Sequence, residues 1–151
     1  LEDYRPLHGA TTGDGLLPEA VDKSPREVEA VADMAIVDGA RRHYRMNDDL
    51  ARRGVIFTDL ATAVRQHPEL VQRALGSVVA TDENKFSALH YALWNSGTFV
   101  YVPRNVVIDQ PLQTVVYQSE GKQAGSHHTL VLTEESAVVT LVGITWARQA
   151  A

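Results

Sequence analysis

The segment from Asp82 to Gln113 changes its hydrophobic pattern halfway along, and the interpretation of the whole chain starts from this change. From Lys85 to Asn95, apolar side chains recur at spacings of three and four residues, which predicts a helix with one apolar stripe. Thr81 or Asp82 is expected to cap its first turn, and the stripe is expected to pack against another element. The stripe consists of Phe86, Leu89, Leu93 and Trp94, with His90 on the same side.

Beyond Gly97 the chain consists of short β-branched and aromatic runs separated by turn residues, a pattern that predicts strands. Such a series is typical of a sandwich, a barrel or a parallel β-helix, and periodicity does not choose among the three. The predicted strands cover residues 98–102, 106–108, 112–117, 129–133 and 137–142.

Upstream, Asp38-Gly39 stands between two β-prone runs and predicts a β-hairpin near residues 35–46. Asn47 to Arg53 is expected to form a turn or a short helix that ends at Gly54. A brief strand over residues 55–57 follows.

Two helices are predicted next. The first begins at Thr58 or Asp59 and ends at His67, because the residue before a proline is disfavoured in the helical region. The second begins at Pro68 and ends at Gly76, and residues 78–79 form an extended link. The expected apolar positions are Leu60, Ala63 and Val64 in the first helix and Leu70, Val71, Ala74 and Leu75 in the second.

The first 23 residues lack sustained periodicity and are interpreted as a loose lead-in. Ser24-Pro25-Arg26-Glu27 is typical of a helix start, since Ser24 can cap the helix and Glu27 can return the capping-box bond. The buried side of this short helix is expected to consist of Val28, Val31 and Ala32.

The composition is that of a globular protein, with 44% hydrophobic and 22% charged residues among 151. A net charge of −5 argues against a nucleic-acid surface, because phosphate contacts need clustered Lys and Arg. The chain has no cysteine, which excludes disulfides and thiolate chemistry within it. No apolar run reaches the length of a membrane span and no signal peptide opens the chain, so we expect a cytoplasmic protein without membrane contact.

The six histidines do not indicate a metal site. Four are spread over unlike predicted elements, and the other two are adjacent in a predicted strand, where they should point to opposite faces. On the apolar stripe of its helix, His90 is expected to be a hydrogen-bonded core histidine. The histidines are His8, His43, His67, His90, His127 and His128.

Two further motifs also favour structural roles. Glu134-Glu135 contains two carboxylates, but adjacent residues diverge, whereas a glycosidase needs two carboxyl groups that face each other across a sugar. We therefore predict a turn there. Gly121-Lys122 lacks the glycine five residues earlier that a phosphate-binding P-loop requires, and it is interpreted as a loop.

Three long segments carry a family resemblance: ENKFSALHYALWNSGTFVYVP (83–103) followed by PLQ, GVIFTDLATAVRQHPELV (54–71) and HHTLVLTEESAVVTLVG (127–143). Together they closely resemble the SufB/SufD family of iron–sulfur cluster assembly proteins, over roughly Ala40 to Gly143. The motifs Asn84-Lys85-Phe86 and Tyr101-Val102-Pro103 are interpreted as signatures of the fold.

The resemblance implies an α+β, mainly β fold. A small helical N-terminal domain over 1–96, with the hairpin near 35–46, is expected to lead into the start of a right-handed parallel β-helix over 97–151. A β-helix that stops after a few coils leaves an open sheet end, so we interpret the chain as an N-terminal fragment and expect self-association through that end. Trp94, Phe99 and Tyr101 are expected to form a hydrophobic lid on the open end of the β-helix.

The resemblance also implies a non-catalytic subunit of the SUF assembly complex. Its partners would be a SufB-like sister β-helix scaffold subunit and a SufC-like ABC-type ATPase. Residues 90–91, 95–96 and 121–126 depart from the family pattern in a way that favours a SufD-like chain. The family's cluster-handling residues lie later in the β-helix, so we expect no catalytic, cofactor-binding or metal-binding residue here. The iron–sulfur cluster would be handled by the full complex.

Two alternatives come from other classes of protein. A β-helix carbohydrate-active enzyme would need a groove of carboxylates and aromatics, whereas the predicted strands carry mostly Val, Leu, Thr and Tyr. A self-contained binding module would require the 151 residues to fold cooperatively as a monomer.

Overall fold

The computed structural model describes residues 5–6, 17–22, 29–119 and 123–148. These residues form short helices and strands, of which β1 (Arg5–Pro6), α1 (Glu19–Asp22), β2 (Ala32–Val37), β3 (Ala40–Met46), α2 (Asp48–Arg52), β4 (Ile56–Asp59) and α3 (Leu60–Gln66) come first. They are followed by α4 (Pro68–Ala74), α5 (Lys85–Leu93), β5 (Ser96–Val102), β6 (Leu112–Gln118), β7 (Gln123–Ala124), β8 (His127–Thr133) and β9 (Leu141–Ala147).

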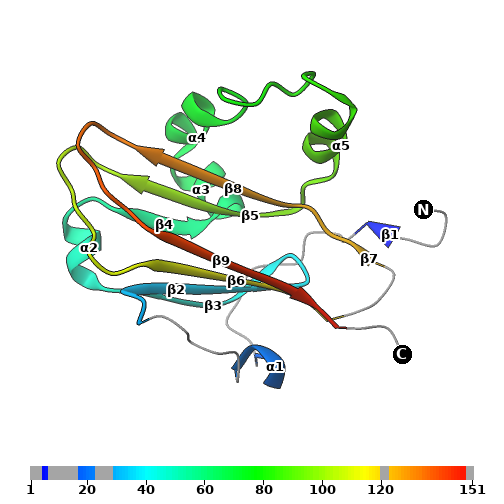
Figure 1. Ribbon diagram of the computed structural model, residues 1–151, viewed down its shortest axis with the longest axis horizontal. Coiled ribbons are helices and arrows are strands. Elements are labelled where there is room, and N and C mark those ends of the chain that lie inside the picture. The colour runs from blue at the N-terminus through cyan, green and yellow to red at the C-terminus, as the bar shows by residue number, and fades with distance from the viewer. Residues whose placement is uncertain (1–4, 7–16, 23–28, 120–122, 149–151) are drawn as a thin grey trace.

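The strands form two larger sheets, ordered β3-β2-β6-β9 and β4-β5-β8, and a small pair, β1-β7. The two larger sheets lie one above the other in Figure 1, with α3 and α4 on the outer side of β4-β5-β8. Pairing is antiparallel for β2–β3 and β4–β5 but parallel for β2–β6, β6–β9 and β5–β8. The fold class is therefore mixed α+β, and the described strands do not close into a barrel.

Two of the parallel pairs, β5–β8 and β6–β9, have similar offsets along the chain, whereas β2–β6 joins Ala32 to the distant Leu112. In β5 and β8, Ser96 lies opposite His127, 31 residues later. In β6 and β9, Leu112 lies opposite Leu141. Successive segments thus repeat the same strand positions and stack in register.

The turns between these strands coincide as well. Val107 and Val138 form an isolated parallel bridge, and the amide of Asn105 donates to the carbonyl of Glu135 at 3.0 Å. Asn105 and Ser136 both have positive φ, of 60° and 59°. The strand predicted at 106–108 is therefore reduced to a bridge, and the one predicted at 137–142 is a bridge followed by β9.

The hairpin around Asp38-Gly39 is confirmed. Both turn residues have positive φ, 50° and 82°, as the tight turn between paired antiparallel strands requires. Its first strand already begins at Ala32, because β2 pairs with β3 on one side and with β6 on the other. The expectation that Ala32 lies in a helix is therefore wrong, and the predicted helix start at 24–28 lies outside the described residues.

The predicted succession of α2, α3 and α4 is confirmed. The carboxylate of Asp59 caps α3 by accepting from the Thr62 amide at 2.8 Å, and α4 begins at Pro68. Gly54 and Gly76 follow α2 and α4 with φ of 80° and 75°, a conformation that favours glycine. Both larger sheets combine strands from before and after residue 96, since β2 pairs with β6 and β4 with β5.

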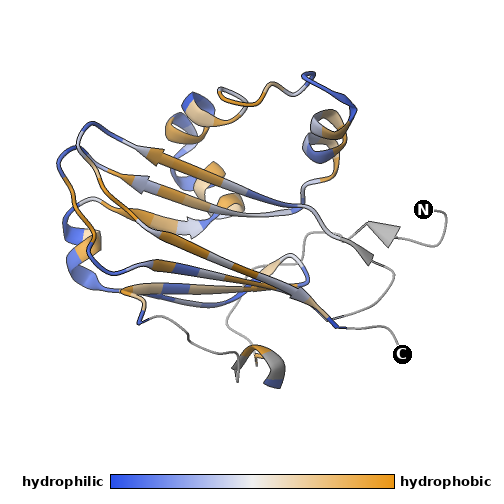
Figure 2. Ribbon diagram, in the orientation of Figure 1, coloured by the Kyte–Doolittle hydropathy of each residue, from blue (hydrophilic) through white to orange (hydrophobic). Residues whose placement is uncertain are grey.

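Two predictions about α5 are wrong. The cap is Asn84, which accepts from the amides of Phe86 and Ser87 at 2.9 and 3.0 Å, whereas Thr81 and Asp82 lie in a preceding turn. The apolar stripe is not packed either: Phe86 is 69% exposed and Leu89 52%. Figure 2 shows that α5 bears both hydrophobic and hydrophilic residues, and Figure 1 shows that it stands apart from the other helices. The apolar stripe stays exposed because α5 contacts β8 through His90 and Tyr91.

Three clusters make up the described core. One fills the space between the two larger sheets, where Phe57, Val100 and Leu112 are buried. Another lies between α3, α4 and the outer face of β4-β5-β8, and a third includes Val21 and Tyr117 on the other sheet.

The predicted aromatic lid is wrong. Phe99 is fully buried in the cluster beneath α3, and Trp94 and Tyr101 are partly buried against that same cluster. The edge of β5 that the lid would protect is covered by β4, which pairs with β5 in antiparallel fashion. None of the helices in the described part of the chain combines the length and apolarity of a membrane span.

Candidate functional site

Two histidines that the sequence keeps far apart meet between α5 and β8. His90 Nε2 lies 2.8 Å from His128 Nδ1, and the two residues are 38 positions apart. The other ring nitrogen of His90 hydrogen-bonds to the hydroxyl of Ser126 at 2.7 Å. We call Ser126, His90 and His128 the histidine chain. His90 is therefore hydrogen-bonded, as predicted, but it lies at a half-buried junction and not in a core.

Aromatic side chains surround the histidine chain. The ring of His128 lies 5.5 Å from that of Tyr91 and 5.9 Å from that of Trp94, measured between centroids. The hydroxyl of Tyr91 donates to the carbonyl of Val79 at 3.0 Å. Burial lowers the pKa of His128, and the nearby charge of His90 lowers it further.

His127 points to the opposite face of β8, as predicted for adjacent strand residues. Its two ring nitrogens lie 3.1 Å from the hydroxyl of Ser96 and 3.0 Å from that of Thr98. The Thr98 hydroxyl in turn donates to Thr114 at 3.3 Å, inside the space between the sheets. Burial lowers the pKa of His127 to about 4, with smaller contributions from the charges of His128 and His90. The ring is therefore neutral at pH 7.

The remaining histidines do not join this site. His43 lies 2.8 Å from the carboxylate of Asp33, which also binds Arg45 at 2.7 Å. Burial alone would raise the pKa of Asp33, but the hydrogen bonds from Arg45 and His43 outweigh it and lower the pKa. His67 lies between α3 and α4, and His8 lies outside the described residues. In the described part of the chain, no three His, Asp or Glu side chains are grouped so that they could hold a metal ion.

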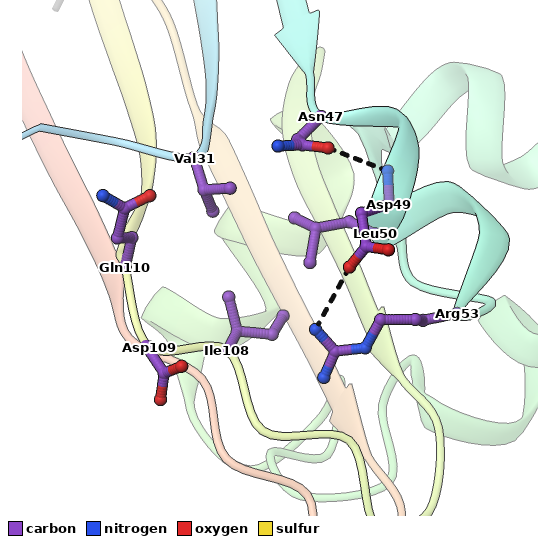
Figure 3. A pocket seen from close by; sticks show the side chains of 8 residues that line it. All are labelled: Val31, Asn47, Asp49, Leu50, Arg53, Ile108, Asp109 and Gln110. Carbon is purple, nitrogen blue, oxygen red and sulfur yellow. Dashed lines mark hydrogen bonds and ion pairs between the residues drawn. The ribbon is translucent and has the colours of Figure 1, made fainter.

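A cleft of about 210 Å³ lies where α2 approaches residues 108–110 (Figure 3). The polar side chains of α2 and its flanks in this cleft are engaged: Asn47 Oδ1 accepts from the Asp49 amide at 2.8 Å, and Arg53 pairs with the Asp49 carboxylate at 3.7 Å. Arg53 also donates to the carbonyl of Val107 at 2.7 Å. The arrangement fastens α2 to the turn before β6.

A second cleft, of about 310 Å³, separates β3 from β4 and α3. Arg41 crosses it, with its guanidinium 2.9 Å from the Asp59 carboxylate and 3.1 Å from the Thr58 hydroxyl. The same guanidinium lies over the ring of Tyr44, 5.2 Å from its centroid. The cation in this cleft is therefore neutralised by a carboxylate of the protein itself.

The Glu134-Glu135 motif lies at the end of β8 and in the following turn, as predicted. Each carboxylate makes its own ion pair, Glu134 with Arg73 at 2.5 Å and Glu135 with Arg104 at 2.8 Å. The hydrogen bond from Arg73 lowers the pKa of Glu134. The two groups thus do not face one another, while Gly121-Lys122 lies outside the described residues.

The meeting of His90 with His128 is the feature that the sequence analysis missed. The expected placement of His90 on an apolar stripe rested on helical periodicity alone. Nothing local to either residue indicates which strand α5 approaches. The weak signal is the pair of polar aromatic residues His90 and Tyr91 next to each other among the apolar positions of the helix.

These elements define a mixed α+β domain built on parallel strand pairs. The family model for the SufBD protein N-terminal region matches residues 28–114. The chain belongs to the SufBD family, in agreement with the resemblance noted in the sequence.

Curated relatives extend the match. The "Iron-sulfur cluster assembly protein SufD" of Bacillus subtilis (strain 168) is 40% identical over 106 residues, which are 70% of this chain and 24% of that protein. An "Iron-sulfur cluster assembly SufBD family protein" of Staphylococcus haemolyticus is 35% identical over 126 residues, 83% of this chain and 26% of that protein. The homologous protein of Staphylococcus aureus (strain USA300) is 33% identical over 126 residues, which are again 83% of this chain and 26% of that protein. The chain thus spans about a quarter of the length of these relatives.

Proposed function

We propose that this chain belongs to a non-catalytic subunit of a SUF machine that assembles iron–sulfur clusters. The observation that carries the proposal is the family match over residues 28–114. That range contains the β2–β3 hairpin, the caps at Asp59 and Asn84 and the whole of β5. The matched part is thus the framework that sets the two larger sheets against each other.

The proposed architecture is the start of a right-handed parallel β-helix over 97–151, preceded by an N-terminal domain over 1–96. The parallel pairing of β5 with β8 and of β6 with β9 supports it. The bridge between Val107 and Val138 adds a third stacked position in each repeat. Strands β8 and β9 are the edges to which a further coil would add.

The proposed partners are a SufB-like sister subunit and a SufC-like ABC-type ATPase, with no nucleic acid or membrane involved. The relative named SufD supports a SufD-like role in this assembly. The cluster would be the cargo of the whole complex, and no residue of this chain is proposed to bind it. This chain's contribution would be structural, in the cytoplasm.

A carbohydrate-active enzyme is less well supported by the contacts. Its two carboxylates would have to face each other across a substrate, whereas Glu134 and Glu135 each bind a separate arginine. The ion pair of Arg41 with Asp59 likewise removes a free carboxylate from the larger cleft.

The experiment that tests the proposal is affinity purification of the full-length protein from its own cells, with partners identified by mass spectrometry. We expect an ABC-type ATPase and a second SufBD family subunit to copurify in stable proportion. As a matched control, Asp49→Ala alters an exposed ion pair on α2 and should leave the complex intact. Recovery of the protein alone, even at low ionic strength, would contradict the proposal.

A second measurement tests the role in cells. Depletion of the protein should lower the activity of iron–sulfur enzymes while leaving enzymes without such clusters unchanged. Equal activity of both classes after depletion would argue against a role in cluster assembly.

A further inference from the structure

Helix α5 is held to the rest of the molecule in an unusual way. None of its residues is buried, and the apolar side chains of Phe86, Leu89 and Leu93 are all exposed. Its attachment runs through His90, which bonds to His128 of β8, and through Tyr91, which bonds to the loop at Val79. The position of α5 therefore depends on a few polar contacts and not on a buried apolar face.

The histidine chain is the central one of these contacts. Ser126 Oγ, His90 and His128 form a continuous row of hydrogen bonds of 2.7 and 2.8 Å. Beside it, the amide of Asn95, just after α5, donates to the carbonyl of Ser126 at 3.2 Å. The row thus spans from the last turns of α5 to the start of β8.

The bond between the two rings constrains their protons. His90 Nε2 and His128 Nδ1 face each other, so one must carry the hydrogen and the other must offer a lone pair. With one ring charged the bond persists, because the second ring still supplies an acceptor. With both rings charged, two N–H groups and two positive charges face each other, and the geometry fails.

The groups around the pair do not offset a second charge. The rings of Tyr91 and Trp94 lie beside His128, and the nearest other titratable group on β8, His127, lies on the other face of the strand. None of these three is a carboxylate. The partly buried setting of His128 adds to the cost of charging it.

We propose that Ser126, His90 and His128 form a proton-operated latch that fixes α5 against β8 and releases it when both rings become charged. Above neutral pH the latch is closed. In mildly acidic solution α5 detaches, and the exposed apolar side chains of α5 change their position relative to the sheets.

The test is hydrogen exchange of the full-length protein, read by mass spectrometry at about pH 7.5 and about pH 5.0 and corrected for the intrinsic effect of pH. Peptides covering β5 follow the global stability, and peptides covering α5 should lose roughly tenfold more protection than these at the lower pH. This range stays above the pKa of about 4 of His127, so that ring remains mostly neutral in the folded protein, and its effect on global stability is registered by the β5 peptides.

Matched variants separate the latch from general acid effects. In His128→Asn an uncharged side-chain amide takes the place of ring atom Nδ1, and in His90→Gln such an amide takes the place of Nε2. Two charged rings can then no longer face each other, so each variant should keep α5 protected at both pH values. His128→Leu should leave α5 unprotected at both. His67→Gln, at the junction of α3 and α4, should behave as the native protein does.

The native protein keeping full α5 protection at about pH 5.0 would overturn the proposal. So would a loss of α5 protection equal to that of the native protein in either His128→Asn or His90→Gln. If one of these variants fails to fold, the other still decides the question.

Discussion

Arg41 of β3 and Asp59 at the end of β4 form an ion pair of 2.9 Å that joins the edges of the two larger sheets. Asp59 is only 4% exposed, and its carboxylate also accepts from the amide and the hydroxyl of Thr62, at 2.8 and 2.7 Å. One side chain therefore caps α3 and links both sheets at the same point.

Replacing this carboxylate should destabilise the protein strongly. Asp59→Ala removes a helix cap, worth about 1 kcal/mol, and leaves the partly buried Arg41 without its partner, so we expect a total loss of about 2–4 kcal/mol in the free energy of unfolding. Urea-induced unfolding followed by circular dichroism measures it. Asp49→Ala, which affects only exposed pairs on α2, is the control and should cost less than about 1 kcal/mol. Equal losses in both variants would contradict this account.

The hydroxyl of Thr98 should matter more than its size indicates. It is fully buried and bridges Thr114 and His127. Thr98→Val keeps the shape but leaves both partners without this bond, which should cost about 1–3 kcal/mol in the free energy of unfolding. In the double variant with Thr114→Val the losses should be less than additive, since the second change removes a group that was already unsatisfied. Strict additivity in a double-mutant cycle would show that the two hydroxyls do not interact.

The elements predicted correctly are those with local causes. The turn at Asp38-Gly39 needs positive φ at two residues, which this dipeptide accommodates readily. The end of α3 at His67 follows from the proline next to it. In each case the residues that determine the structure lie within a few positions of one another, so the sequence displays them directly.

The predictions that failed depended on distant partners. The apolar stripe of α5 has the helical spacing of a buried face, but no element of the described chain covers Phe86 or Leu89. The contact of His90 with His128 depends on which strand α5 approaches, and that is decided by the pairing of β5 with β8. Ala32 was misplaced for the same reason, because its strand is stabilised by β6, far along the chain.

The buried His127 should make stability depend on pH. Its pKa is about 4 in the folded protein and 6.5 when unfolded. Above pH 6.5 both states carry a neutral ring, so there is no penalty. As the pH falls from 6.5 to 4, the unfolded state binds a proton that the folded state does not, and the free energy of unfolding falls by roughly 3 kcal/mol.

Unfolding in urea at a series of pH values measures this dependence. His127→Gln should reduce the slope between pH 6.5 and 4, leaving the smaller contribution of His128, whose pKa is also lowered. His67→Gln serves as the control and should keep the native slope. If the free energy of unfolding of His127→Gln depended on pH as steeply as that of the native protein, the ring of His127 would not be the source of this dependence.

Two glycines in strands of different sheets, Gly97 in β5 and Gly143 in β9, should respond oppositely to the same substitution. A Cβ at Gly97 would collide with the carbonyl oxygen of His128 and lie 2.8 Å from Leu60 Cβ, so β5 could not keep its distance from α3. Gly97→Ala should therefore cost about 3 kcal/mol or more in the free energy of unfolding. At Gly143 no atom lies within 4 Å of an added Cβ, and alanine is preferred over glycine within a strand, so Gly143→Ala should be neutral or stabilising by up to about 1 kcal/mol. Thermal unfolding of the two variants beside the native protein measures both effects. A Gly97→Ala variant as stable as Gly143→Ala would mean that α3 packs on β5 less closely than described.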